Sequence, residues 1–98
     1  MILTTTNSIE GHEIKDYLGI VTGVNMNYQK GTFTFSMKKY YDAIGNEVNN
    51  VKELAFQQLK ENAIKLNANA IVGISVDLEI TSTGTTTISV TGTAVRVA

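Results

Sequence analysis

Apolar residues recur at helical spacing through the middle of the chain. Between about Val48 and Leu66 there is no glycine, and good helix formers dominate. The apolar positions follow one another at intervals of four, four, four and three residues, at Val51, Ala55, Leu59, Ala63 and Leu66. Because residues three or four apart share one face of a helix, this spacing predicts an amphipathic helix with one buried face. A shorter helix is predicted over Ser36 to Ile44, with Gly45 expected to end it.

Alternating apolar and polar positions predict strands on both sides of these helices. A short strand is expected over Ile2 to Thr5, and a longer one over Tyr17 to Met26. Two more are expected over Ile71 to Ile80 and Thr85 to Val97, joined by a hairpin turn at 81–84. Residues 1–98 therefore form a single domain of the α+β class, in which one long helix packs on a mainly antiparallel sheet in two layers.

One helix covers only one face of such a sheet, so the strand residues divide into two sets. The set expected to face the helix is Leu18, Ile20, Val24, the alternate apolar positions of 72–80, Ile88, Val90 and Ala94. The opposite set is Tyr17, Gly19, Val21, Gly23, Ile71, Gly73, Ser75, Val95 and Val97, with Asp77 and Glu79 toward the hairpin.

The second face is too apolar and too rich in small residues to be an ordinary solvated surface. We therefore expect other copies of the chain to cover it, so that the protein is a homo-oligomer. The alternative is that residues 27–44 fold back over this face within one chain. That segment carries a group of aromatic and apolar side chains, at Tyr28, Phe33, Phe35, Met37, Tyr40 and Tyr41.

Charge and composition exclude several classes of function. Eight Lys and Arg against nine Asp and Glu give a net charge of −1, which provides no bulk attraction to nucleic acid or to anionic lipid. The absence of cysteine removes disulfides, thiolate metal sites and cysteine nucleophiles. No stretch approaches the roughly 20 apolar residues that span a membrane, and no basic leader opens the chain. We expect a cytoplasmic protein with no nucleic-acid and no membrane partner.

Enzymatic chemistry has little support in these residues. His12 is the single histidine, and it leaves a very limited repertoire for acid–base catalysis. The basic and aromatic run Lys38-Lys39-Tyr40-Tyr41 is too short to indicate nucleic-acid binding on a chain of this charge. We expect a protein that is not an enzyme and that needs no cofactor.

Two small groups of residues are candidates for binding. Glu10 and His12 lie close together in sequence, with Glu13 beside them, while Asp77 and Glu79 are two apart on a strand and point the same way. Copies of these carboxylates from several subunits would suit a hard divalent cation. The alternative is that they are ordinary solvated charges, which on an edge strand discourage aggregation.

Aromatic stacking offers a second kind of site. The four tyrosines Tyr17, Tyr28, Tyr40 and Tyr41 are candidates for holding a flat ligand between subunits. Packing in the core or at a subunit contact is the simpler explanation, since aromatic residues are enriched at such contacts.

Four separated segments, in order, resemble the YbjQ-like family. They are Ile2 to Gly11, Tyr17 to Gly23, Leu66 to Ile74 and Thr91 to Val95, and the resemblance covers essentially the whole chain. The family consists of small bacterial proteins of unknown function that often carry the label "putative heavy-metal-binding". The resemblance implies a dodecin-subunit type of fold and a ring-shaped pentamer. The function we expect is that of a binding or scaffold protein whose ligand is unknown. A divalent or heavy metal is the alternative ligand.

The chain departs from the family pattern before the long helix. Gly45-Asn46-Glu47-Val48 stands where the family usually has a Gly-Gly-Arg-Ser-like stretch, so a basic residue that would meet an anion is missing. At the end of the helix, Asn67 replaces a usual glycine. Asparagine tolerates the left-handed conformation, so the fold expected from the resemblance is unaffected.

Overall fold

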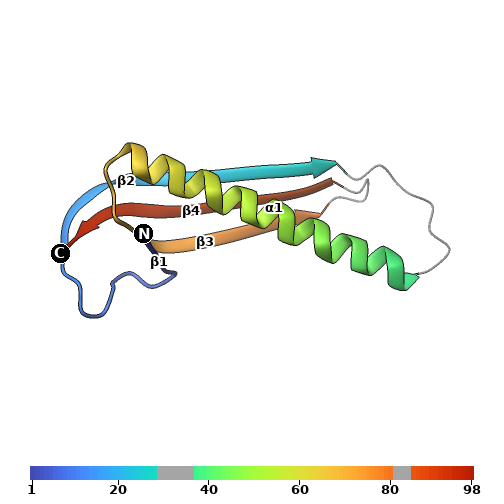
Figure 1. Cartoon of the computed structure of the whole chain (residues 1–98), viewed down its shortest axis with the longest axis horizontal. Coiled ribbons are helices and arrows are strands. Elements are labelled where there is room, and N and C mark those ends of the chain that lie inside the picture. Colours follow the sequence, from blue (N-terminus) through green and yellow to red (C-terminus); the bar gives the residue numbers. More distant parts are fainter. Residues whose placement is uncertain (29–36, 81–84) are drawn as a thin grey trace.

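A computed structural model describes residues 1–28, 37–80 and 85–98, and the side chains of these except 27, 28 and 37–47. The chain folds as one helix on a four-stranded mixed sheet (Figure 1), which confirms the α+β class and the two layers. The strands are β1 (Ile2–Leu3), β2 (Ile14–Tyr28), β3 (Ala70–Ile80) and β4 (Thr85–Val97), and the helix is α1 (Met37–Lys65). The predicted hairpin turn at 81–84 lies outside the described residues.

The strands lie in the order β1-β3-β4-β2. The long strands β2 and β3 both pair antiparallel with β4, which confirms the mainly antiparallel sheet. The short strand β1 is parallel to the start of β3, through Ile2 with Ala70 and Leu3 with Ile71. The sheet is therefore bounded by β2 along one side and by β1 with the rest of β3 along the other.

The helix is continuous from Met37 to Lys65, so the prediction of a separate helix ending at Gly45 was wrong. A single glycine inside a helix costs only about 1 kcal/mol relative to alanine, and the favourable residues on both sides outweigh that cost. With 29 residues the helix is about 44 Å long. It ends where the apolar spacing predicted, and Asn67 follows it with a left-handed φ of 64°.

The predicted apolar face of the helix forms the core. Val51, Ala55, Leu59 and Ala63 are all fully buried. They pack against buried residues of three strands, which are Val21, Ile71, Ile74, Ile88, Val90 and Ala94. Gly23 brings β2 and α1 very close together, since a Cβ there would lie 2.0 Å from the backbone oxygen of Ala55.

The prediction for the faces of β2 was wrong beyond Leu18. Leu18 packs on the core as expected, but Val21 and Gly23 face the helix, while Ile20 and Val24 are 78% and 46% exposed. The register with β4 shifts between Tyr17 and Gly19, and Gly19 has a φ of 139°. This bulge adds one residue, and one extra residue moves every later side chain to the other face.

A second bulge inverts the predicted faces at the start of β3. Ile71 belongs to the core under the helix, whereas Val72 faces away from it, the reverse of the expectation. The register with β4 shifts between Val72 and Ser75, and Gly73 within this bulge has a φ of 62°. Beyond it the predicted alternation holds, because Ile74 is buried under the helix.

The face opposite the helix is covered in part by the chain's own N-terminal segment. Ala70, Val72 and Val95 form a small buried cluster there, with Ile9, Ile14 and Val97 packed around it. The predicted alternative, in which 27–44 covers this face, was wrong for Met37 to Ile44, because these residues continue the helix. Residues 29–36 lie outside the described part.

The molecule is elongated, with extents of 55 × 23 × 17 Å. Its radius of gyration is 16.4 Å, against about 13 Å for a compact domain of this length. No helix in the described parts of the chain is long and apolar enough to cross a membrane.

Candidate functional site

The segment between β1 and β2 lies against the bulge of β3. The amide of Gly73 donates to the backbone oxygen of Thr6 at 2.8 Å, and the amide of Ile74 donates to that of Thr4 at 3.1 Å. The side chain of Asn7 lies beside Gly73, where a Cβ would be 3.5 Å from its Oδ1. Two of the segments that resemble the YbjQ-like family, Ile2 to Gly11 and Leu66 to Ile74, are thus in direct contact.

Hydroxyl groups in this segment bond mainly to the segment itself. The Thr4 and Thr6 hydroxyl oxygens are 2.7 Å apart, and the Thr6 hydroxyl donates to the backbone oxygen of Ser8 at 2.6 Å. An open hollow of about 590 Å³ lies over them, lined by Ile2, Thr4, Thr6, Ser8, Ile9 and Glu10. Glu10 is the one charged side chain among these lining residues.

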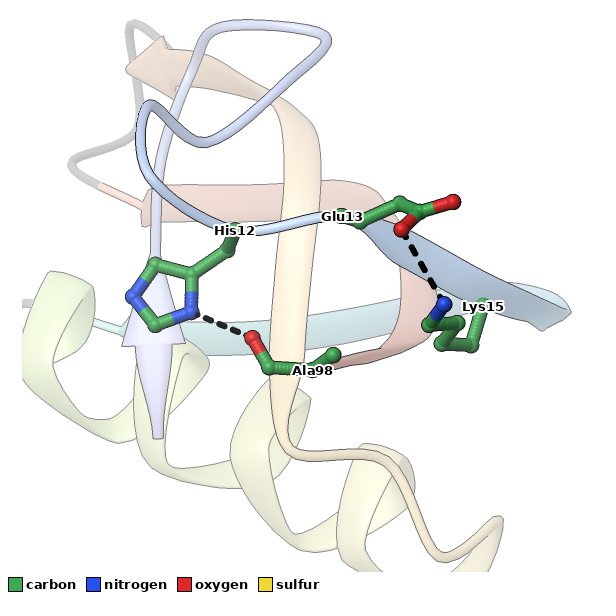
Figure 2. Close-up of polar contacts among 4 residues, drawn as sticks. All are labelled: His12, Glu13, Lys15 and Ala98. Carbon is green, nitrogen blue, oxygen red and sulfur yellow. Dashed lines mark hydrogen bonds and ion pairs between the residues drawn. The ribbon is translucent and has the colours of Figure 1, made fainter.

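His12 is tied to the last residue of the chain (Figure 2). Its Nδ1 lies 2.8 Å from the backbone oxygen of Ala98, and the amide of Ala98 donates to the backbone oxygen of Glu13 at 3.0 Å. Because a carbonyl oxygen only accepts, the ring must donate through Nδ1. In the neutral ring Nε2 is then the nitrogen that is available to bind a metal.

Glu13, beside His12, forms an ion pair with Lys15. The Lys15 ammonium lies 3.0 Å from its carboxylate, as Figure 2 shows, and both side chains are more than half exposed. Exposed ion pairs of this kind contribute at most about 1 kcal/mol. The ammonium beside Glu13 disfavours a cation there only weakly, and Glu10 and His12 remain the ligand candidates in this segment.

The other two metal candidates lie farther along the sheet. Asp77 and Glu79 are exposed on β3, where they are opposite Ser89 and Thr87 of β4 on the face away from the helix. The N-terminal segment meets β3 at Ala70, and Asp77 is seven residues, or about 23 Å along the strand, beyond that point. The described residues bring no three His, Asp or Glu side chains together, so a single chain does not gather these four candidates.

The tyrosines are also spread out. Tyr17 is 72% exposed near the start of β2, while Tyr28 ends the same strand about 36 Å away. Tyr40 and Tyr41 lie in the first turns of α1, in the part whose side chains are not described. Tyr17 and Tyr28 therefore cannot bind the same small ligand within one chain.

Two helix side chains that the sequence analysis did not single out close the outer edge of β2. The amide of Val24 donates to Gln58 Oε1 at 2.7 Å, and Asn62 Nδ2 donates to the backbone oxygen of Thr22 at 2.8 Å. Amide side chains four residues apart, beside an apolar helix face, were the available signal. They satisfy the backbone groups that an edge strand otherwise offers to another strand.

The opposite edge of the sheet is open over part of its length. β1 and the residues after it pair with β3 only through 70–74. From Ser75 to Ile80, no strand in the described parts of the chain pairs with the outer side of β3. The apolar side chains Val76, Leu78 and Ile80 lie on this half-strand, and each is about half exposed.

The comparisons with known proteins agree with one another. The family model described as "Putative heavy-metal-binding" matches residues 1–98. A UPF0145 protein from Bacillus cereus is 36% identical over 107 residues, covering 99% of this chain and all of its own. One from Bacillus thuringiensis is 39% identical over 103 residues, with the same coverage.

A solved structure shows a similar fold. It is a protein of unknown function of the DUF74 family from Pediococcus pentosaceus. The TM-score is 0.72 at 18% identity, and the match covers all of this chain and 98% of that one.

Proposed function

Since this chain belongs to the YbjQ-like family, we propose that it is the subunit of a homo-oligomeric binding or scaffold protein, with a ligand still to be identified. The observation that carries the proposal is the surface area. The chain exposes 6626 Å², whereas a folded monomer of 10.6 kDa is expected to expose about 5,500 Å². The excess of roughly 1,100 Å² exceeds the approximately 800 Å² that each partner buries in a typical stable interface.

Apolar side chains make up a notable part of this surface. Six of them lie on the two outer long strands, at Ile20, Val24 and Met26 of β2 and Val76, Leu78 and Ile80 of β3. Single apolar residues scattered over a surface are normal on a monomer, whereas large apolar patches are typical of protein contacts. The resemblance to the family supports five copies in a ring. We keep the cytoplasm as the proposed location, with which the absence of cysteine is compatible.

Native mass spectrometry of freshly purified protein tests the proposal. We expect a species of about 53 kDa, which is five times the chain mass, together with any small molecule that the assembly retains. A spectrum with the single chain alone at micromolar concentration would contradict the proposal.

Binding of a hard divalent cation is a second candidate, and it depends on the assembly. The observation in its favour is the pair Asp77 and Glu79, exposed on one face of β3 next to hydroxyl residues of β4. Carboxylate and hydroxyl oxygens suit Mg²⁺, Mn²⁺ or Ca²⁺, while the absence of thiolates does not suit a soft heavy metal. A complete site requires carboxylates from more than one copy.

Titration calorimetry with these ions and Zn²⁺ tests this candidate. We expect binding heat for a hard cation that is lost in the variant Asp77→Asn with Glu79→Gln. The matched control is Glu53→Gln on the helix, which should bind as the wild type does. Equal heat in the carboxylate variant, or none in the wild type, would remove this site. Retained heat that disappears with His12→Ala would assign the metal to His12 instead.

A further inference from the structure

We infer that the copies meet head to tail, with the apolar row of β3 in one copy packed on the apolar row of β2 in the next. The β3 row is Val76, Leu78 and Ile80, and the β2 row is Ile20, Val24 and Met26. This inference rests on the proposed homo-oligomer and adds which two surfaces make its contact. The occupant of each row is therefore a second copy of the chain.

The β3 row extends the core surface beyond the cover of the described helix side chains. Val76 is paired with Val90 and Leu78 with Ile88, and these two partners on β4 are fully buried under α1. Cross-strand partners point to the same face, so the β3 row lies on the helix side of the sheet. The described part of α1 packs mainly on β2 and β4, and the β3 row is left between 45% and 51% exposed.

The β2 row lies on the opposite face and at the opposite edge. Ile20, Val24 and Met26 are paired with Thr93, Ser89 and Thr87 of β4, and their exposed fractions range from 46% to 78%. Their β2 neighbours Val21 and Gly23 point to the helix, so these three side chains point away from it. The N-terminal segment covers the other end of this face, around Val72 and Val95.

A two-fold contact through either row leaves the other row uncovered. A symmetric pairing of two β3 edges would also bring Asp77 and Glu79 of one copy beside the same carboxylates of the other, and like charges across a strand pair are destabilising. The outer edge of β2 is occupied near its row by Gln58 and Asn62, which disfavours strand pairing there. β2 therefore contributes its face to the contact.

A head-to-tail contact covers both rows in every copy. Contacts between two different surfaces generate rings when the rotation between neighbours closes. A single two-fold contact ends at a dimer, so the ring of the proposed function requires a contact between two different surfaces. Each chain in such a ring makes two contacts, which at about 800 Å² each would bury about 1,600 Å², and the excess area of roughly 1,100 Å² per chain accounts for about two-thirds of that.

Two variants that each damage one row test the inference by mixing. Leu78→Lys leaves the β2 row intact, and Ile20→Lys leaves the β3 row intact. We expect each variant alone to be a folded monomer, so its mass in native mass spectrometry should be one fifth of the wild-type assembly's mass. Mixed at equal concentration, with one variant labelled with ¹⁵N, they should form a one-to-one heterodimer of about 21 kDa, because a single intact contact remains between them. Circular dichroism checks that each variant is folded.

The control is Gln57→Lys, which places the same charge on an exposed position of the helix and should assemble as the wild type does. If the wild type is itself a monomer, the proposed function fails, and this inference fails with it. If the wild type assembles but either variant still assembles, or the mixture gives no heterodimer, the head-to-tail contact is wrong while the homo-oligomer stands.

Discussion

Gly23 is the residue at which the helix and the sheet approach most closely. A Cβ at this position would lie 2.0 Å from the backbone oxygen of Ala55 and 2.8 Å from the amide nitrogen of Leu59. Backbone atoms in the middle of a helix cannot move aside as a flexible side chain can. The absence of a side chain at Gly23 therefore sets the distance between α1 and β2.

Gly23→Ala should lower the free energy of unfolding by about 3 kcal/mol or more, because α1 must move away from β2 and lose packing. Urea unfolding at fixed protein concentration measures the loss. Gly92→Ala is the matched control, since its Cβ would first meet the side chains of Ile71 and Ile74. It should cost less, and an equal or smaller loss at Gly23 would mean that the close approach is not as described.

At the scale of elements, regular periodicity was predictable and the bulges were not. The helix face from Val51 to Ala63 follows from the spacing alone, because only one helical arrangement buries all of these residues. The faces of β2 depend on the extra residue near Gly19, and those of early β3 on the bulge at Gly73. A single added residue leaves the alternation of the sequence unchanged while it inverts the side that each residue takes.

The candidate site was predictable only as separate pieces for a related reason. Spacing places Asp77 and Glu79 on one side of a strand, and it places Glu10 near His12 in sequence. The distance between the two pairs depends on how the N-terminal segment folds back on β3, which no local pattern encodes. The contact between His12 and Ala98 joins residues 86 apart in the chain, and no local pattern predicts it either.

The continuity of the helix through Gly45 gives a direct prediction. Gly45→Ala should raise the free energy of unfolding by about 0.5–1 kcal/mol, because alanine has the better helix propensity and restricts the unfolded chain. Urea unfolding at fixed concentration again provides the measurement. If the helix ended at this glycine in a left-handed conformation, alanine would be strained and the stability would fall instead.

The closed edge of β2 gives another prediction about stability. The double variant Gln58→Ala with Asn62→Ala removes the two hydrogen bonds to Val24 and Thr22 and should cost about 1–2 kcal/mol, since each such bond contributes about 1 kcal/mol. Hydrogen exchange should show faster exchange of the Val24 amide. Gln57→Ala, on the outer side of the helix, should leave both readouts unchanged. Unaltered exchange at Val24 in the double variant would show that the helix does not close this edge.

At the scale of the whole molecule, a single helix is too little cover for three long strands. Among the described residues, the helix packs on β2 and β4 and the N-terminal segment covers one end of the other face, which leaves two apolar rows at opposite edges and on opposite faces. The elongated shape and the large exposed area agree with the finding that the helix covers only part of the sheet. Both are accounted for if neighbouring copies supply the missing layer.

Sedimentation velocity on the wild-type protein, over a dilution series down to micromolar concentration, tests this claim most directly. The account predicts a closed species of about 53 kDa that persists on dilution. A 10.6 kDa species that is folded and unfolds cooperatively throughout the series would contradict it.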